Sequence, residues 1–152
     1  NATAPPRPEA LCAMAEAAEG AWGNPSSGYA EGRQAKAALE IARARVAEAI
    51  GAEASEIVFT SGGTESNNLA LFGTVGARRA AHVVVSPIEH ASVLGPVREL
   101  ERRGARVTWL AVDGEGRVDP SAVAAAVAAD TALVSVGWAN NSFMRAAQSG
   151  WL

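Results

Sequence analysis

FTSGGTESNNLAL, residues Phe59–Leu71, begins with aromatic and β-branched residues typical of a strand, passes through two glycines and continues with the period of a helix. A junction of this kind is typical of α/β proteins, and its helix start favours an anion because the first amides are unpaired. Gly63 lets a phosphate approach the backbone closely, and the hydroxyls of Ser61 and Thr64 can donate to it or cap the helix. From these residues alone, an ordinary turn with a positive-φ glycine and a threonine cap is an equally good interpretation.

The chain around this junction alternates between helical and strand-like patterns. Before it, the sequence predicts helices at 8–20 and about 29–50, the second closed by Gly51. After Gly51, the sequence predicts strands at 57–59, 82–86, 107–112 and 132–138, and helices at 65–79, 91–103 and 120–129. Strands separated by helices imply right-handed crossovers and a mainly parallel sheet covered on both faces. The predicted fold class is α/β.

Composition excludes several classes of function. With 152 residues, 49% of them hydrophobic, and a net charge of -3, the chain has the size of one globular domain and lacks the basic surface that a nucleic-acid partner requires. No apolar run is long enough to cross a membrane, and the N-terminal residues do not resemble a signal peptide, so we expect a cytoplasmic protein. The single cysteine, Cys12, has no partner for a disulfide or metal site, and we expect it buried or half-buried in an alanine-rich helix.

Two polar positions follow later strands of the predicted sheet. His90 comes after the strand at 82–86, and Asn141 comes after the strand at 132–138. Each alone is more typical of a helix cap or a turn, but the carboxyl ends of parallel strands share one edge, where both would meet the glycine turn. A phosphate site, a flat imidazole and an amide donor suit a planar aromatic cofactor with a phosphate and a ring oxygen. The nucleotide motifs G-x-x-x-x-G-K-[ST] and G-x-G-x-x-G are absent.

Six sequence blocks in order resemble one family. They are NAT at 1–3, GNPSS at 23–27, FTSGGTESNN at 59–68, IEHASVL at 88–94, VDGEGRVDP at 112–120 and TALVSVGWANN at 131–141. Together they resemble the class V aminotransferase-like enzymes that use pyridoxal phosphate, and most of all the cysteine desulfurases. The resemblance implies an N-terminal helical segment over 1–50, part of the fold-type I large domain over 51–141, and an aberrant tail over 142–152.

The resemblance also implies roles for individual residues. Gly63 and Thr64 would bind the cofactor phosphate, His90 would stack on the pyridine ring and assist proton transfer, and Asn141 would bond the phenolic oxygen; no metal site is implied. Full-length relatives use L-cysteine, move its sulfur to an enzyme cysteine and release alanine, in support of iron-sulfur cluster assembly. A sulfur-acceptor protein and a homodimer are the partners that the resemblance implies, without nucleic acid or membrane.

The sequence also departs from that family. A pyridoxal enzyme needs a lysine for its Schiff base, but the only lysine is Lys36, which lies on a predicted amphipathic helix. Cys12 matches no sulfur-accepting position, and SFMRAAQSGWL at 142–152 replaces the expected continuation. We therefore expect a truncated or frameshifted chain that lacks turnover and exposes an apolar sheet edge. The alternatives are a fragment of a selenocysteine lyase or an aminotransferase, or a non-catalytic partner that dimerises with a full-length relative.

Overall fold

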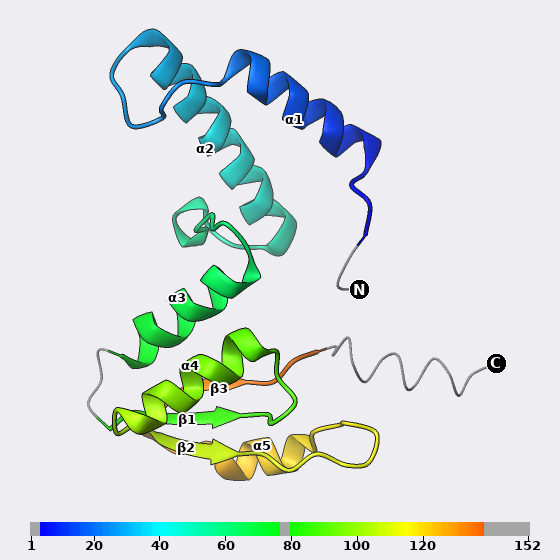
Figure 1. Ribbon diagram of the computed structural model, residues 1–152, viewed down its shortest axis with the longest axis vertical. Helices are drawn as coiled ribbons and strands as arrows, with labels where there is room; N and C mark the ends of the chain where they lie inside the picture. The colour runs from blue at the N-terminus through cyan, green and yellow to red at the C-terminus, as the bar shows by residue number, and fades with distance from the viewer. Residues whose placement is uncertain (1–3, 77–79, 139–152) are drawn as a thin grey trace, which may run out of the picture. The chain divides into compact units, whose positions relative to one another are not determined.

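The structure is a computed structural model that describes residues 4–76 and 80–138 (Figure 1). The chain divides into two compact units, Asn1–Phe59 and Thr60–Leu152. The first unit holds helices α1 (Pro8–Gly20) and α2 (Ala30–Ile50) and a short 3-10 turn, η1 (Ala54–Glu56). The second holds α3 (Gly63–Val75), β1 (His82–Val85), α4 (Ala91–Arg102), β2 (Arg106–Trp109), α5 (Pro120–Ala126) and β3 (Thr131–Ser135).

Both predicted helices of the first unit are confirmed. Proline lies at the start of α1, and Gly51 ends α2 in the left-handed region, with φ of 69° and its N–H donating to Glu48 and Ala47 carbonyls. The loop between the helices folds closely onto α2, because a Cβ on Gly23 would lie 2.4 Å from the backbone of Glu31. Among residues 4–59, the buried ones are all small, namely Gly23, Gly32, Ala35 and Ala47.

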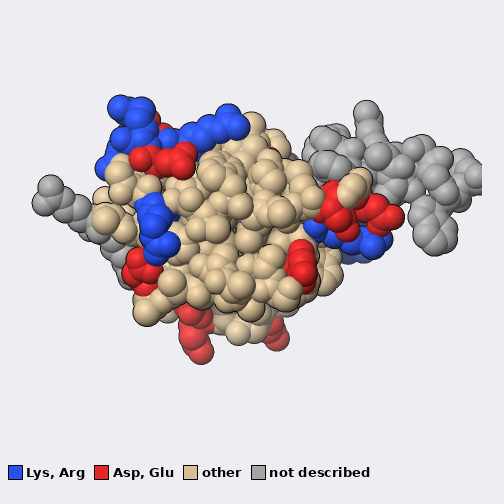
Figure 2. All heavy atoms as spheres, turned by 90° about the horizontal axis from the view of Figure 1, so that it is seen from below, with Lys and Arg blue, Asp and Glu red and all other residues tan. Residues whose placement is uncertain are grey.

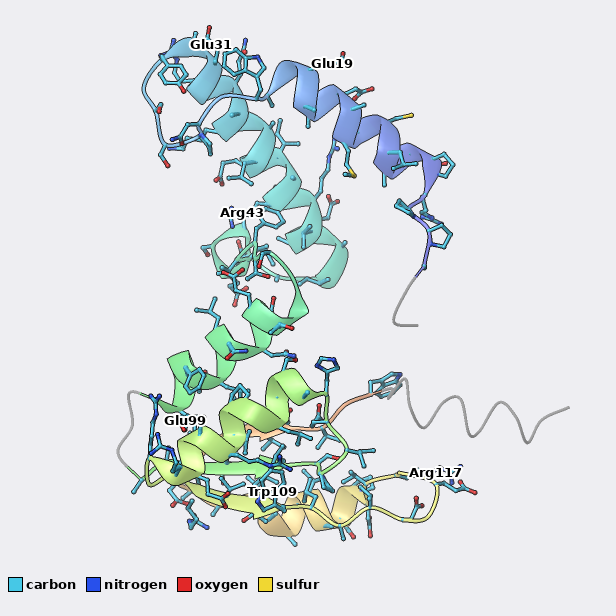
Figure 3. The ribbon with its side chains drawn as sticks, viewed as in Figure 1. Glu19, Glu31, Arg43, Glu99, Trp109 and Arg117 are labelled. Atoms are coloured by element: carbon cyan, nitrogen blue, oxygen red, sulfur yellow. The ribbon has the colours of Figure 1, made fainter. Side chains whose placement is uncertain are left out.

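The predicted strand at 57–59 is wrong. Ile57 is extended, with φ of -93° and ψ of 124°, but no strand pairs with this segment in the described part of the chain. Instead Arg43 of α2, labelled in Figure 3, donates to the Ile57 carbonyl and lies over the Phe59 ring at 5.1 Å. The apolar residues that suggested a strand are therefore partly solvent-exposed, Val58 by 64% and Phe59 by 44%.

The second unit is built on a parallel sheet with the strand order β2-β1-β3. The predicted strands at 82–86, 107–112 and 132–138 are thereby confirmed in shorter form, and so is the α/β class. Figure 1 shows α4 on one side of the sheet and α5 on the other, as alternating strands and helices in a parallel sheet require. The strands all point toward the end of the unit at which α4 begins.

The core lies between the sheet and helices α3 and α4. Val83 and Val85 of the central strand pack in one cluster with Leu71 and Val75 of α3 and Val97 of α4. Every residue of β1 is fully buried because the strand has a neighbour on each side and cover on each face. Burying one such valine side chain contributes about 1.5–3 kcal/mol to the free energy of folding, so this strand is a main source of stability in the second unit.

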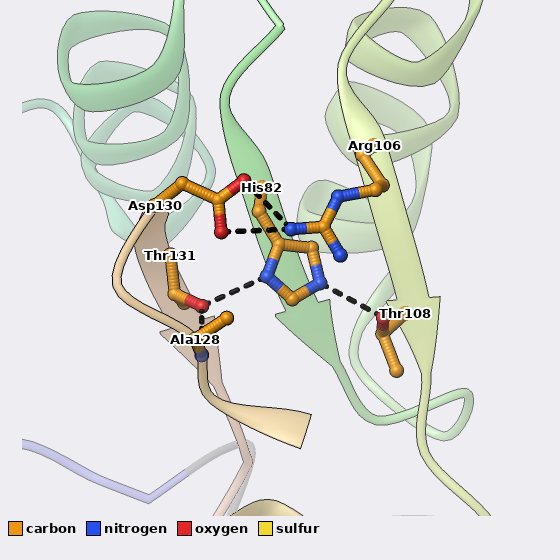
Figure 4. Close-up of polar contacts among 6 residues, drawn as sticks. All are labelled: His82, Arg106, Thr108, Ala128, Asp130 and Thr131. Atoms are coloured by element: carbon orange, nitrogen blue, oxygen red, sulfur yellow. Dashed lines mark hydrogen bonds and ion pairs between the residues drawn. The ribbon is translucent and has the colours of Figure 1, made fainter.

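A histidine at the amino end of β1 joins the three strands (Figure 4). His82 is fully buried, and its Nδ1 and Nε2 each lie 2.8 Å from a threonine hydroxyl, Thr131 of β3 and Thr108 of β2 respectively. Beside it, Arg106 donates to both carboxylate oxygens of Asp130, at 2.8 and 2.7 Å. This polar cluster lies at the opposite end of the sheet from the strand ends where ligands bind in α/β proteins.

Candidate functional site

The first turn of α3 leaves its amides open. Its N-cap, Gly62, has an extended backbone with φ of 163° and no side-chain cap, and the first helical bond runs from the Ser66 N–H to the Gly62 carbonyl at 3.1 Å. The N–H groups of Gly63 and Thr64 precede that bond and take no part in the helical ladder. A Cβ added at Gly62 or Gly63 would meet nothing within 4 Å, so the surface before these amides is open. Gly62 and Gly63 do not lie in the left-handed region and no threonine side chain caps the helix, so this turn differs from the ordinary one that the sequence left possible.

The two hydroxyls of the turn differ in availability. Ser61 donates its hydroxyl to Glu65 Oε2 at 2.6 Å, and its N–H donates to the same oxygen at 2.7 Å. These bonds, the hydroxyl first, lower the pKa of Glu65 and keep its carboxylate charged. The Thr64 hydroxyl has no hydrogen bond among the described residues, so it is the one that is free to donate to an anion. The carboxylate of Glu65 opposes such an anion, whereas the helix dipole favours it.

His90 lies at the N-cap of α4, after the carboxyl end of β1. Its Nδ1 accepts the N–H of Ser92 at 3.1 Å and lies 2.8 Å from the Ser92 hydroxyl oxygen. Asn67 of α3 donates to that same hydroxyl at 2.8 Å, so the amino-terminal parts of α3 and α4 are joined. Because Asn67 lies one helical turn after Thr64, the structure brings the predicted phosphate turn and His90 into one region.

The loops after β1 and β3 meet at the same edge. The N–H of Gly137 donates to the carboxylate of Glu89, and a Cβ at Gly137 would lie 3.4 Å from that carboxylate. Glu89 therefore fixes the residues that follow β3 against those that precede α4. Asn141, the fourth predicted site residue, lies outside the described residues.

A small cavity adjoins this region between α3, α4 and β3. Its volume is about 180 Å³, and its lining is mostly aliphatic with two polar side chains. The lining residues are Asn67, Ala70, Leu71, Val93, Leu133, Val134 and Ser135. Sequence reasoning did not single out Asn67 or Ser92, because the two lie 25 positions apart and no local pattern links them.

The lysine and the cysteine lie in the other unit. Lys36 is exposed on α2 and Cys12 is exposed on α1, so the expected buried or half-buried thiol is wrong. Alanine-rich α1 buries none of its residues, which explains the exposure of the thiol. Residues 60–76 and 80–138 contain no lysine. In the described part of the chain, no cluster of three metal-ligating side chains occurs, and no helix has the length and apolarity to cross a membrane.

Comparison with known proteins gives the same family for nearly the whole chain. The family model for aminotransferase class-V matches residues 1–143. A cysteine desulfurase IscS from Dictyoglomus turgidum is 46% identical over 142 residues, which cover 92% of this chain and 36% of that protein. A selenocysteine lyase from Xenopus laevis is 41% identical over 157 residues, which cover 93% of this chain and 37% of that protein. The chain thus spans little more than a third of the length of the curated relatives that it matches.

Comparison with solved structures gives the same family. The structure of SspA in complex with cysteine matches this one with a TM-score of 0.84 at 34% identity, over 92% of this chain and 41% of that chain. A NifS-like protein matches with a TM-score of 0.81 at 32% identity, over 97% of this chain and 44% of that chain. These likenesses confirm the predicted fold, a partial large domain of the fold-type I pyridoxal phosphate enzymes. The chain belongs to the class-V aminotransferase family and resembles the N-terminal part of cysteine desulfurases.

Proposed function

We propose that this chain carries the phosphate-binding and ring-binding half of a pyridoxal phosphate site of the cysteine desulfurase type. The observation that carries the proposal is the junction of the open first turn of α3 with His90, through the bond from Asn67 to Ser92 at 2.8 Å. Gly63 and Thr64 would hold the cofactor phosphate through their amides and the Thr64 hydroxyl, and His90 would lie against the ring. Asn141 would bond the ring oxygen, as the resemblance implies.

The donor set fits the phosphate end of this cofactor. Open amides at a helix start, with no Cβ at residues 62 and 63, suit a dianionic group that must come close to the backbone. When bound, pyridoxal phosphate supplies an electron sink for bond cleavage at the α-carbon of an amino acid. His90 would orient that group, and the bond from the Gly137 N–H to the Glu89 carboxylate would fix the loop edge beside it.

The donor set does not fit the aldehyde end. Covalent attachment needs a lysine, and the only lysine, Lys36, matches no position at which the resemblance places the Schiff-base lysine. We infer that the 152-residue polypeptide holds the cofactor noncovalently and does not by itself convert L-cysteine to alanine. L-Cysteine as the substrate of the whole protein, a sulfur-acceptor protein and a homodimer belong to the same proposal. The similarity to a selenocysteine lyase makes selenocysteine the alternative substrate.

Pyridoxamine 5′-phosphate tests this proposal, because it has the phosphate and the ring but no aldehyde that could react with Lys36. By isothermal titration calorimetry, we expect the 152-residue chain to bind pyridoxamine 5′-phosphate and not the dephosphorylated pyridoxamine. Thr64→Ala removes one hydrogen bond to a charged group and should weaken binding about 10-fold. Thr74→Ala, at an exposed position near the other end of α3, is the matched control and should leave the affinity unchanged.

The outcomes separate binding from turnover. Equal affinity of the wild type, Thr64→Ala and Thr74→Ala would contradict the assignment of the phosphate site. Release of alanine from L-cysteine by the purified chain with pyridoxal phosphate, above the rate with cofactor alone, would contradict the absence of turnover. Release of alanine from selenocysteine but not from L-cysteine would also contradict the absence of turnover, and it would favour selenocysteine as the substrate.

A further inference from the structure

Three side chains near the candidate site form a hydrogen-bonded relay, Asn67–Ser92–His90. The Asn67 amide donates to the Ser92 hydroxyl oxygen at 2.8 Å, and that oxygen lies 2.8 Å from His90 Nδ1. The backbone N–H of Ser92 also points at Nδ1, at 3.1 Å. Ser92 is only 8% exposed, so its hydroxyl has little access to water as an alternative partner.

Donor and acceptor chemistry sets the direction of the relay. A backbone N–H can only donate, so Nδ1 must accept and carry no proton. The Ser92 oxygen already accepts from Asn67, and its own proton is then free to donate to Nδ1 as well. A neutral imidazole has one N–H, which must therefore lie on Nε2. In the described part of the chain, Nε2 of His90 has no hydrogen-bond partner.

We propose that Asn67 and Ser92 are positioning residues that hold neutral His90 with its proton on Nε2. The inference rests on the proposed function in one respect only, that Nε2 then faces the cofactor site. There His90 presents an N–H donor rather than a lone pair. Acting as a base through Nε2 would require the proton on Nδ1, where it would oppose the Ser92 N–H and leave a donor unpaired.

Nitrogen-15 NMR of the 152-residue chain tests this directly. The chain has two histidines, so a long-range proton–nitrogen correlation spectrum should contain only the rings of His82 and His90. At about pH 9, where an ordinary histidine is neutral, we expect His90 Nδ1 to resonate as an unprotonated nitrogen and Nε2 as a protonated one. A protonated Nδ1 in the wild type would overturn the proposal.

Two variants test the roles of Asn67 and Ser92. Ser92→Ala keeps the backbone N–H but removes the hydroxyl donor, so the Nδ1 resonance of His90 should move downfield. Asn67→Asp should accept the Ser92 proton and withdraw it from Nδ1, which moves part of the population to the tautomer protonated on Nδ1. The matched control is Asn68→Asp, whose parent side chain donates to the Thr64 carbonyl at 2.8 Å and has no hydrogen bond to Ser92.

The His82 ring serves as the internal reference for folding. Its resonances should be unchanged in every variant, since neither of its hydrogen-bond partners, Thr108 and Thr131, is changed or bonded to a changed residue. If His82 is unchanged and His90 Nδ1 has the same shift in the wild type and Ser92→Ala, the relay does not act on His90. Because these spectra are recorded without added cofactor, the result does not depend on whether the chain binds pyridoxamine 5′-phosphate. If Asn67→Asp unfolds, Ser92→Ala still decides the matter.

Discussion

His82 is a buried polar side chain whose hydrogen bonds stabilise the sheet of the second unit. Its two ring nitrogens lie 2.8 Å from hydroxyls on the two strands that flank β1. His82→Ala would leave a void and two threonine hydroxyls without their partner, and we expect it to lower the free energy of unfolding by about 2–4 kcal/mol. Thr108→Val removes one of the two bonds and should cost about 1–3 kcal/mol.

Urea denaturation monitored by circular dichroism measures both losses. Thr74→Val is the control, because Thr74 is exposed on α3 and should change the free energy of unfolding by no more than about 0.5 kcal/mol. Equal stability of His82→Ala and the wild type would show that the buried hydrogen bonds of this ring contribute nothing.

Some of these residues could be predicted from the sequence and others could not. His90 could be predicted because a strand end feeding a helix start is a local pattern, and the structure indeed places it at the N-cap of α4. His82 and its partner Thr131 are 49 positions apart, so their contact depends on which strands become neighbours. The same holds for Asn67 and Ser92, whose contact depends on the packing of α3 against α4.

At the scale of elements, α4 carries a charge cluster near its carboxyl end. Glu99, labelled in Figure 3, accepts from Arg102 at 2.8 Å and from Arg103 at 2.7 Å, and these bonds lower its pKa from 4.5 to about 2. A carboxylate with a depressed pKa stabilises the folded state above its unfolded pKa. That contribution is lost as the pH falls from about 4.5 to about 2.

Thermal melts between about pH 5 and about pH 2 test this contribution. Over that range we expect the melting temperature of the wild type to fall more than that of Glu99→Gln, which has no carboxylate to protonate here. Glu101→Gln, at an exposed position of the same helix, is the control and should follow the wild type. Parallel curves for the wild type and Glu99→Gln would contradict the prediction.

The elements differ in how well the sequence predicted them. Helices such as α1, α2 and α4 follow from local periodicity, caps and glycine ends, and they were predicted within a residue at each end. The segment 57–59 has the composition of a strand but no strand beside it in the described residues, and a strand forms only with a partner. Composition alone could not supply that information.

At the scale of the whole molecule, the sheet of the second unit has an edge strand, β3, with no further partner strand among residues 60–76 and 80–138. β3 is a terminal strand in the order β2-β1-β3, and Val134 and Val136 at and beyond it are each 42% exposed. On the face of this unit seen in Figure 2, uncharged side chains cover the middle and charged ones lie at the margins. Two partly exposed valines therefore lie on and just after this edge strand.

Such an edge favours association between chains. We expect the average mass in sedimentation velocity to rise with concentration for the wild type, and to rise less for Val134→Lys, since a charge on an edge strand opposes pairing. Val127→Lys, at a 47% exposed position just after α5, is the control and should behave as the wild type. Identical mass in all three chains would show that β3 does not mediate association.

The central claim is that the glycine turn and His90 form one binding site. Amide and ring spectra of the nitrogen-15-labelled chain, recorded during titration with pyridoxamine 5′-phosphate and separately with inorganic phosphate, test it most directly. We predict that both ligands shift the amides of Gly63 and Thr64, whereas only pyridoxamine 5′-phosphate also shifts the ring signals of His90. If His90 does not respond to pyridoxamine 5′-phosphate while the turn does, or if neither ligand shifts the turn, the two features are not one cofactor site.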